Sequence, residues 1–135
     1  MKEKNTNSKY IFALGRRKEG RASIMLFEGQ GENLVNGKNL NEYFPLKVDQ
    51  VIALRPLKLL ELDKSVYFTA KVVGGGKKGI RDAISLGISR ALIKKDVEYK
   101  KVLRKEGLLT RDDRIVERKH TGFVKARKRP QYSKR

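Results

Sequence analysis

The sequence predicts an α+β fold: a two-layer domain of about four β-strands with helices packed on one face, followed by an extended basic C-terminal tail. Three observations support this class. Short β-branched and aromatic runs alternate in the way strands do, one long segment repeats apolar residues at helical spacing, and the cationic end carries too few apolar residues to form a core. With 135 residues, of which 39% are hydrophobic, the chain suits one domain plus a tail.

The first predicted elements are two strands of an antiparallel pair. Residues 1–9 are polar and are expected to form a disordered extension. Residues 10–14 and 24–27 are short apolar runs with strand-like alternation. The connection, residues 15–20, is expected to be a turn that carries Arg16, Arg17 and Lys18. Residues 28–37 are rich in turn formers, and Asn36-Gly37 predicts a tight turn.

Short helices and a central strand are predicted next. Residues 39–44 favour a helical turn that ends at Pro45. Residues 49–54 predict a second helix, N-capped near Asp49 and interrupted before Pro56. Residues 57–62 are apolar and are compatible with either helix or loop. Residues 66–73, VYFTAKVV, are β-branched and aromatic and give the clearest strand of the chain.

A glycine-rich segment and a long helix follow that strand. Residues 74–79, GGGKKG, form the predicted loop. The helix after it should bury one stripe against the sheet. A last helix is expected from a cap at Asp96 to about residue 105, with Gly107 as its stop. We therefore expect a globular domain over residues 10–109 and a C-terminal tail over residues 110–135. The stripe consists of Ile80, Ala83, Ile84, Gly87, Ile88, Ala91 and Leu92.

The charge balance indicates an anionic macromolecular partner. The chain has 33 Lys and Arg against 15 Asp and Glu, a net charge of +18, and its self-repulsion falls when phosphates surround it. No apolar run is long enough to span a bilayer, and no basic amphipathic helix carries aromatic anchors, so no membrane partner is expected. The absence of cysteine excludes disulfides and thiolate metal sites. The N-terminus resembles no secretory signal, and we expect an intracellular protein.

The last eighteen residues, RKHTGFVKARKRPQYSKR, are the clearest functional feature. Eight of them are Lys or Arg and none is acidic. Such a segment cannot offset its ordering entropy by burial, so it is expected to be an extended cation that becomes ordered against RNA phosphates. Tyr132 is suited to stacking on a base or ribose of the RNA. An equally good interpretation is that Tyr132 is a disordered side chain while the tail is free of RNA.

The GGGKKG segment admits two interpretations of similar weight. A glycine-rich turn before a helix suits an RNA-phosphate site with Lys77 and Lys78 as added cations, or it is simply a flexible turn. A mononucleotide loop would need GxxxxGK[ST], whereas Gly79 is followed by Ile80 and Arg81. The segment therefore does not predict a nucleotide site.

Catalysis and metal binding find little support in the sequence. His120 is the only histidine and lies in the polar tail, where a preorganised pocket is not expected. One histidine without cysteine makes transition-metal ligation improbable, and we expect no cofactor. Asp112 and Asp113 are better explained as ion-pair partners of Arg111 and Arg114 than as a catalytic carboxylate pair. The chain is accordingly not expected to be an enzyme.

Several motifs together resemble one known family. In order they are GRRK at residues 15–18, NG at 36–37 with YF at 43–44, GGGKKG at 74–79, GISRAL at 87–92, LTRD at 109–112, VERK at 116–119, KAR at 125–127 and the terminal QYSKR. This pattern is similar to that of small-subunit ribosomal protein nine in its bacterial form, and it covers nearly the whole chain from Tyr10. One departure is Ile80-Arg81, where the family commonly has Gln-Ala.

The resemblance implies a location and a set of partners. It implies the ribosomal-protein superfold with a left-handed βαβ crossover, binding to the 3′ major domain of the rRNA in the head of the small subunit, and contact with neighbouring head proteins. It also implies a protein of the cytoplasm, or of an organelle that kept the bacterial form. The tail would bring its last residues to tRNA in the P site, and these residues are Ser133, Lys134 and Arg135.

The remaining cations of the motifs and tail are the expected rRNA contacts. Two rival hypotheses stay open from the sequence: a phosphotransferase that uses the glycine-rich loop, and a general nucleic-acid packaging protein in which only charge matters. No small-molecule substrate is expected under the ribosomal hypothesis. The predicted rRNA-contacting residues are Arg16, Arg17, Lys18, Lys77, Lys78, Arg111, Arg114, Arg118, Lys119, Lys125, Arg127, Lys128 and Arg129.

Overall fold

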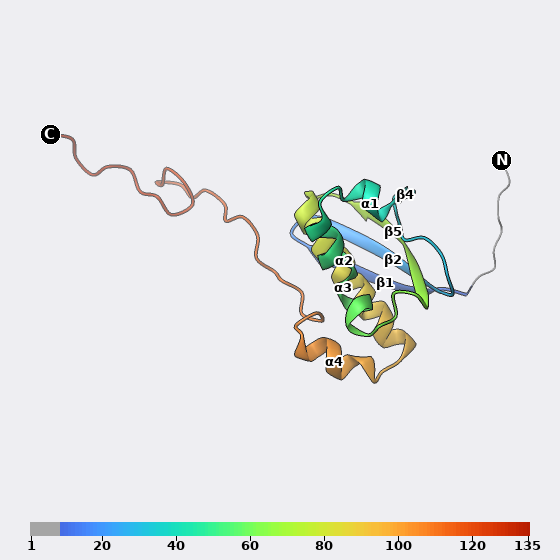
Figure 1. Ribbon diagram of the computed structural model, residues 1–135. Coiled ribbons are helices and arrows are strands. Elements are labelled where there is room, and N and C mark those ends of the chain that lie inside the picture. Colours follow the sequence, from blue (N-terminus) through green and yellow to red (C-terminus); the bar gives the residue numbers. More distant parts are fainter. Residues whose placement is uncertain (1–8) are drawn as a thin grey trace.

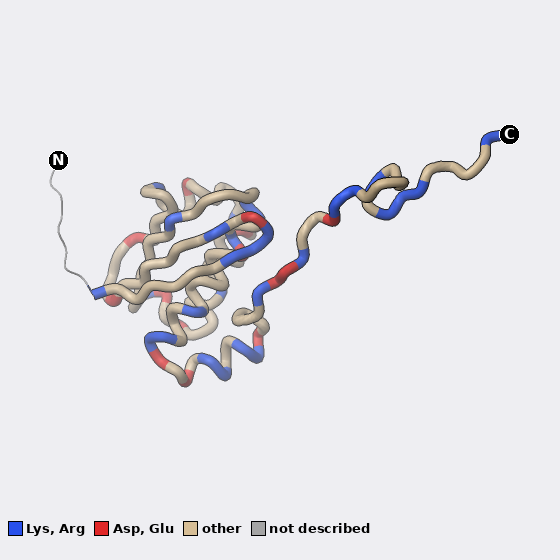
Figure 2. The backbone as a smooth tube through the Cα atoms, turned by 180° about the vertical axis from the view of Figure 1, so that it is seen from behind, with Lys and Arg blue, Asp and Glu red and all other residues tan. Residues whose placement is uncertain are grey.

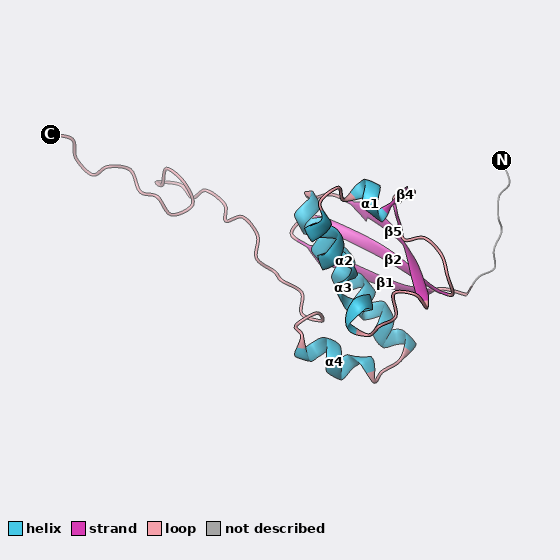
Figure 3. Cartoon of the chain, viewed as in Figure 1, coloured by secondary structure: helices cyan, strands magenta, loops and turns pink. Residues whose placement is uncertain are grey.

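The computed structural model describes residues 9–135 and places one sheet behind a layer of helices (Figure 1). The predicted N-terminal extension lies, except for Lys9, outside the described residues. Figure 3 shows the helices gathered on one face of the sheet, which confirms the α+β class. The elements are β1 (Ile11–Arg17), β2 (Gly20–Glu28), β3 (Leu34–Val35), β4 (Lys38–Asn39), α1 (Leu40–Tyr43), α2 (Lys47–Leu59), β5 (Val66–Val73), α3 (Lys77–Lys95) and α4 (Tyr99–Lys105).

The sheet has five strands in the order β1-β2-β5-β3-β4, where about four were expected. β2 pairs antiparallel with both of its neighbours, β1 and β5, while β3 runs parallel to β5. The chain passes from the β3–β4 hairpin through α1 and α2 to β5. The tight turn is confirmed: Asn36 and Gly37 have φ of 52° and 79°, the left-handed pair that a two-residue hairpin favours.

Two asparagine side chains continue the pairing of the two-residue strand β3. The Phe68 N–H donates to Asn33 Oδ1 at 3.1 Å. The Val72 N–H donates to Asn36 Oδ1 at 2.9 Å, and Asn36 Nδ2 donates back to the Val72 carbonyl at 3.2 Å. Because these amides replace backbone partners, β5 keeps its hydrogen bonds beyond the short β3 ladder.

Helix α3 forms the centre of the core, and its predicted stripe is buried as expected. It packs so closely on β1 and β2 that glycines are required at the crossing. A Cβ added at Gly15 would lie 1.8 Å from the Ala83 carbonyl oxygen, and one added at Gly87 would lie 2.5 Å from Ile24 Cγ1. The larger buried side chains around it include Phe44, Phe68, Leu57 and Leu103.

The edge strand β1 has two of its carbonyls covered by cations of α3. Arg90 Nη1 donates to the Leu14 carbonyl at 2.9 Å, and Lys94 Nζ donates to the Phe12 carbonyl at 2.6 Å. Free strand edges pair readily with other chains, so these two contacts protect the edge.

Helix α2 differs from its prediction. It begins after Leu46, not at an Asp49 cap, and it continues through Pro56 to Leu59. Pro56 is buried together with Ala53 and Leu57. Burial of this face outweighs the hydrogen bond that the proline removes, so the expected interruption is wrong.

The last helix also starts later than predicted. The N-cap of α4 is Glu98, while Asp96 ends α3 and accepts a hydrogen bond from the Glu98 N–H at 3.0 Å. The stop at Gly107 is confirmed, because its φ is 70° and its N–H bonds to the Arg104 carbonyl while Leu108 N–H bonds to the Leu103 carbonyl.

The first hairpin is longer than expected. Arg16 and Arg17 belong to β1 and Gly20 to β2, so only Lys18 and Glu19 form the turn. After α4, residues 106–135 contain neither helix nor strand; the first of them pack against the helices and β1, and the rest of the tail leads away (Figure 1). None of the helices in the described part of the chain is long and apolar enough to cross a membrane.

Candidate nucleic-acid interface

Basic residues are concentrated in three regions of the described chain, with others scattered elsewhere (Figure 2). They line the C-terminal tail, surround α4 and gather at the tip of the β1–β2 hairpin. The three regions are therefore the first places to seek phosphate contacts.

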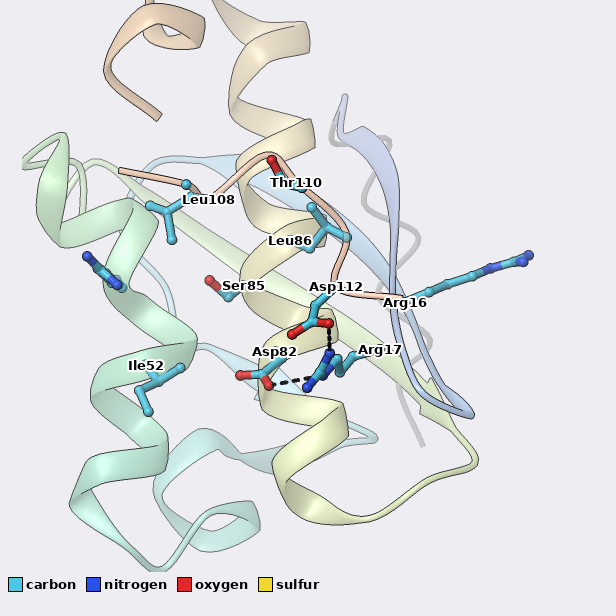
Figure 4. Close-up of a pocket in the computed structure, with 11 residues that line it drawn as sticks. Arg16, Arg17, Ile52, Asp82, Ser85, Leu86, Leu108, Thr110 and Asp112 are labelled. Atoms are coloured by element: carbon cyan, nitrogen blue, oxygen red, sulfur yellow. Dashed lines mark ion pairs between the residues drawn. The ribbon is translucent and has the colours of Figure 1, made fainter. Parts of the chain in front are cut away.

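Arg16 and Arg17 at the hairpin point in opposite directions because strand residues alternate between faces. Figure 4 shows Arg17 directed at Asp82 of α3 and at Asp112, whereas Arg16 extends away from the helices. Arg17 Nε lies 3.7 Å from Asp82 Oδ2, and Arg17 Nη1 pairs with Asp112 Oδ1; its side chain is only 13% exposed. Of the predicted rRNA contacts, Arg17 is thus occupied within the protein, while Arg16 is free to face a partner.

Arg17 also lies across a cavity of about 210 Å³ between β1, α2, α3 and the start of the tail. The walls are mixed, with Ile52, Leu86 and Leu108 beside Ser85 and Thr110 (Figure 4). The Arg17–Asp112 pair holds the tail segment over this cavity. The arrangement suits an internal joint between the tail and the helices.

The glycine-rich segment is shorter as a loop than predicted, because α3 already begins at Lys77. Gly74 and Gly75 have φ of 73° and 64°, and added Cβ atoms would lie 2.7 Å from the Glu19 oxygen and 2.8 Å from the Gly20 nitrogen. These glycines are thus required for close packing on the β1–β2 turn. Their presence does not by itself indicate a phosphate cradle.

The two lysines of this segment have different surroundings. Lys77 Nζ donates to the Tyr43 carbonyl at 2.5 Å and lies 4.9 Å from the centre of the Tyr43 ring. Lys78 is exposed. A cavity of about 500 Å³ opens between the loop, the hairpin turn and the tail, and its lining includes Lys18 and Arg111. Two of the predicted contact residues are therefore brought together here.

The tail carries two local ion-pair clusters. Arg114 Nη2 lies 2.8 Å from Asp112 Oδ2, and hydrogen bonds from Arg114 hold the pKa of Asp112 well below its usual range, with Arg17 adding to the effect. Arg127 Nε donates to Glu117 Oε2 at 2.9 Å and lowers the pKa of Glu117. Both carboxylates stay ionised under mildly acidic conditions, so Arg114 and Arg127 are partly neutralised as RNA contacts.

The other predicted contacts are exposed and form no ion pair with another described residue. Arg129 lies 5.5 Å from the Phe123 ring centre, which orders this part of the tail without removing its charge. Exposed cations that the sequence interpretation missed include Arg21, Lys71, Lys100, Lys101, Arg104 and Lys105. The sequence could have identified Arg21 and Lys71 from the alternation of β2 and β5, which places them on the exposed side. The other four could have been identified from the high positive charge of α4. The predicted residues that remain available are Arg16, Lys18, Lys78, Arg111, Arg118, Lys119, Lys125, Lys128, Arg129, Lys134 and Arg135, beside the exposed Ser133.

The single histidine lies in an exposed setting. His120 Nε2 is 3.6 Å from Glu117 Oε1, and its side chain is 53% exposed. Within residues 9–135 no group of three His, Asp or Glu side chains is arranged to hold a metal ion. His120 is therefore solvent-exposed and positioned to pair with Glu117.

Comparison with known proteins gives concordant matches. The family model for ribosomal protein S9/S16 matches residues 15–135. The small ribosomal subunit protein uS9 of Methylacidiphilum infernorum is 50% identical over 125 residues, covering 93% of this chain and 92% of that protein. Small ribosomal subunit protein uS9 of Renibacterium salmoninarum is 46% identical over 124 residues, covering 91% of this chain and 74% of that protein. The matched residues include the hairpin turn, the glycine-rich segment and the whole tail.

Proposed function

The chain belongs to the ribosomal protein S9/S16 family, and from this premise we propose where it binds in the ribosome and what its tail does. As a family member it is a structural component of the small ribosomal subunit, binds rRNA and works in the ribosome of the cytoplasm. It is not an enzyme. The proposal is finer: residues 10–109 bind the 3′ major domain of the rRNA in the head, among neighbouring head proteins, and residues 110–135 form a tail that contacts tRNA in the P site.

The observation that carries the proposal is the form of the tail. Residues 106–135 hold no helix or strand, and the tail leads away from the folded part as a largely exposed chain (Figure 2). The stretch from Gly122 to Arg135 spans on the order of 40–50 Å when extended, enough to pass between RNA helices. The reach of the tail therefore allows its end to act far from the folded domain.

The chemistry of the last residues suits a contact that serves every tRNA. Arg135 can fork onto a phosphate, and Lys134 offers a mobile charge beside it. Phosphate contacts position a partner without reading its sequence. Exposed Arg16 and Lys18 of the domain, with Arg111 at the start of the tail, are the cations that we propose for rRNA contacts near the domain.

Binding measurements on rRNA fragments test the location. The full chain and a chain that ends at Glu117 would be titrated with the folded 3′ domain, the 5′ domain and a scrambled RNA of equal length across a salt series. Both proteins should prefer the 3′ domain, and loss of the tail should mainly flatten the salt dependence, because fewer phosphates are neutralised. Equal affinity for all three RNAs would contradict the location and favour a charge-only binder.

Removal of Ser133–Arg135 tests the tail. In reconstituted subunits this deletion should weaken P-site tRNA binding about tenfold, because two terminal cations are lost. Incorporation of the protein into the subunit should be unchanged. A matched variant, Lys100→Gln with Lys101→Gln, removes the same charge from exposed α4 and should leave tRNA affinity within about twofold. Unchanged tRNA binding in the deletion, at several salt concentrations, would sink the tail assignment.

A further inference from the structure

The side of the sheet opposite α3 is not covered by any helix of the described chain (Figure 3). Burial alternates along β1, β2 and β5, so every second side chain points to this side. We call it the outer sheet face. It consists of Phe12, Leu14, Arg16, Arg21, Ser23, Met25, Phe27, Tyr67, Thr69, Lys71 and Val73.

One end of the outer sheet face carries three cations and no carboxylate. Arg16 is directly opposite Arg21 in the β1–β2 register, and Lys71 of β5 is the diagonal neighbour of Arg21. Like charges directly across a sheet destabilise it, and this face carries no carboxylate of its own. Glu28, at the end of β2, pairs instead with Lys95 of α3 at 3.4 Å. An anion bound between these three cations would relieve their repulsion.

The other end of the outer sheet face is apolar and aromatic. Phe12 is 44% exposed and Leu14 is 43% exposed, although both lie in a regular strand. The rings of Phe27 and Tyr67 stack on each other with centres 5.1 Å apart, which provides a firm base beside them. Arg16 lies four positions after Phe12 along β1, so the apolar and cationic ends are roughly 13 Å apart. Exposed apolar surface of this kind, next to cations, is typical of a binding surface.

We propose that the outer sheet face binds an unpaired segment of rRNA, with phosphates against Arg16, Arg21 and Lys71 and a base or ribose against Phe12 and Leu14. The charge of the face favours RNA over a neighbouring protein. Stacking platforms beside cations are a general way for sheets to hold single-stranded RNA. This inference rests on the proposed function, because it assumes that the chain binds rRNA, and it adds a second contact surface that is independent of the tail.

Two variants of the full chain test the cationic and apolar ends separately. Arg21→Gln with Lys71→Gln should flatten the dependence of log affinity on log salt by about 1.4, since two single-strand phosphate contacts are lost. The same change should keep or raise the thermal midpoint of the free protein, because it removes the like-charge pair. Phe12→Ser should weaken binding about tenfold without changing the salt dependence. The probe is a complete bacterial small-subunit rRNA, with a scrambled RNA as reference.

Matched controls come from α4 for the apolar variant and from α2 for the cationic variant. Val102 is 43% exposed, so Val102→Ser removes an apolar side chain as exposed as Phe12, and it should change affinity by less than about twofold. On α2, outside the three basic regions, Lys47→Gln with Lys58→Gln removes the same charge as the cationic variant from exposed positions. If each control lost as much RNA affinity as the face variant that it matches, the proposal would be overturned. Net charge and side-chain exposure alone would then explain binding.

The remaining outcomes separate the two hypotheses. If the wild-type chain prefers small-subunit rRNA over scrambled RNA while both face variants bind like wild type, the outer sheet face is not an RNA surface and the proposed function stands. If both variants bind rRNA normally but fail to enter subunits reconstituted with the other proteins, the occupant is a protein and the RNA proposal is wrong. If the wild-type chain shows no preference, the proposed function itself fails.

Discussion

At the scale of single residues, neighbours in the sequence have different roles because the strand sends them to opposite faces. Arg17 is held between Asp82 and Asp112, whereas Arg16 faces outward. Gly15, just before them, is the point where β1 touches α3. The GRRK motif therefore combines a packing residue, an internal ion-pair partner and cations available for RNA.

The prediction at this scale concerns Gly15. Gly15→Ala should lower the free energy of unfolding by about 3 kcal/mol, because the added Cβ meets the Ala83 carbonyl oxygen at 1.8 Å and backbone must move. Gly76→Ala is the control: no atom lies within 4 Å of its added Cβ, and its φ of −96° is ordinary. Urea unfolding of both variants checks this, and equal stability of the two would contradict the close packing of β1 on α3.

At the scale of elements, side chains complete what short elements cannot provide. β3 has two residues, and Asn33 and Asn36 extend its pairing with β5. On the other edge, Arg90 and Lys94 cover the carbonyls of β1. The asparagines thus strengthen the pairing of β5 with β3, while the two cations limit unwanted strand pairing at the free β1 edge.

Asn36 gives the prediction for this scale. Asn36→Ala should lower the free energy of unfolding by about 2 kcal/mol, since the Val72 N–H and carbonyl lose their side-chain partners. Amide hydrogen exchange should show faster exchange at Val72 and unchanged protection in α3. The exposed Asn41 of α1 supplies a control, as Asn41→Ala removes an amide that bonds no strand. Unchanged exchange at Val72 would mean that Asn36 does not hold β3 to β5.

At the scale of the whole molecule, a folded part and an exposed cationic tail meet at a defined joint. Leu108 and Leu109 pack against the core, and Asp112 pairs with Arg17. Within the described part of the chain, residues beyond Glu117 form hydrogen bonds only with other tail residues, including the bond from Arg127 to Glu117. Stability should therefore depend on the joint and be independent of the tail end.

Two truncations test this independence. A chain ending at Glu117 should unfold within about 2 °C of the full protein, because it keeps the joint. A chain ending at Glu106 should lose about 3 kcal/mol, since it lacks Leu108 and Leu109 and leaves Arg17 without Asp112. Calorimetry of the two chains gives the comparison. A large fall in the midpoint of the chain that ends at Glu117 would show that the tail end contributes to the fold.

Much of this protein followed from local patterns. Alternation identified the long strands, the three- and four-residue spacing identified the buried stripe of α3, and the Asn36-Gly37 and Gly107 signals placed a turn and a helix end. The cationic tail was visible from composition alone. These features depend on the preferences of neighbouring residues and on burial of one face, which are written in sequence order.

Tertiary structure decided the rest. Pro56 stays inside α2 because its face is buried, and β3 exists because asparagine side chains and β5 complete it. The candidate interface was predicted only as a list of cations. Packing of the tail segment against β1 and α3 gave Arg17 its carboxylate partners, and strand register set Arg16 opposite Arg21. Sequence determines which charges exist; contacts between distant segments determine which of them remain free for RNA.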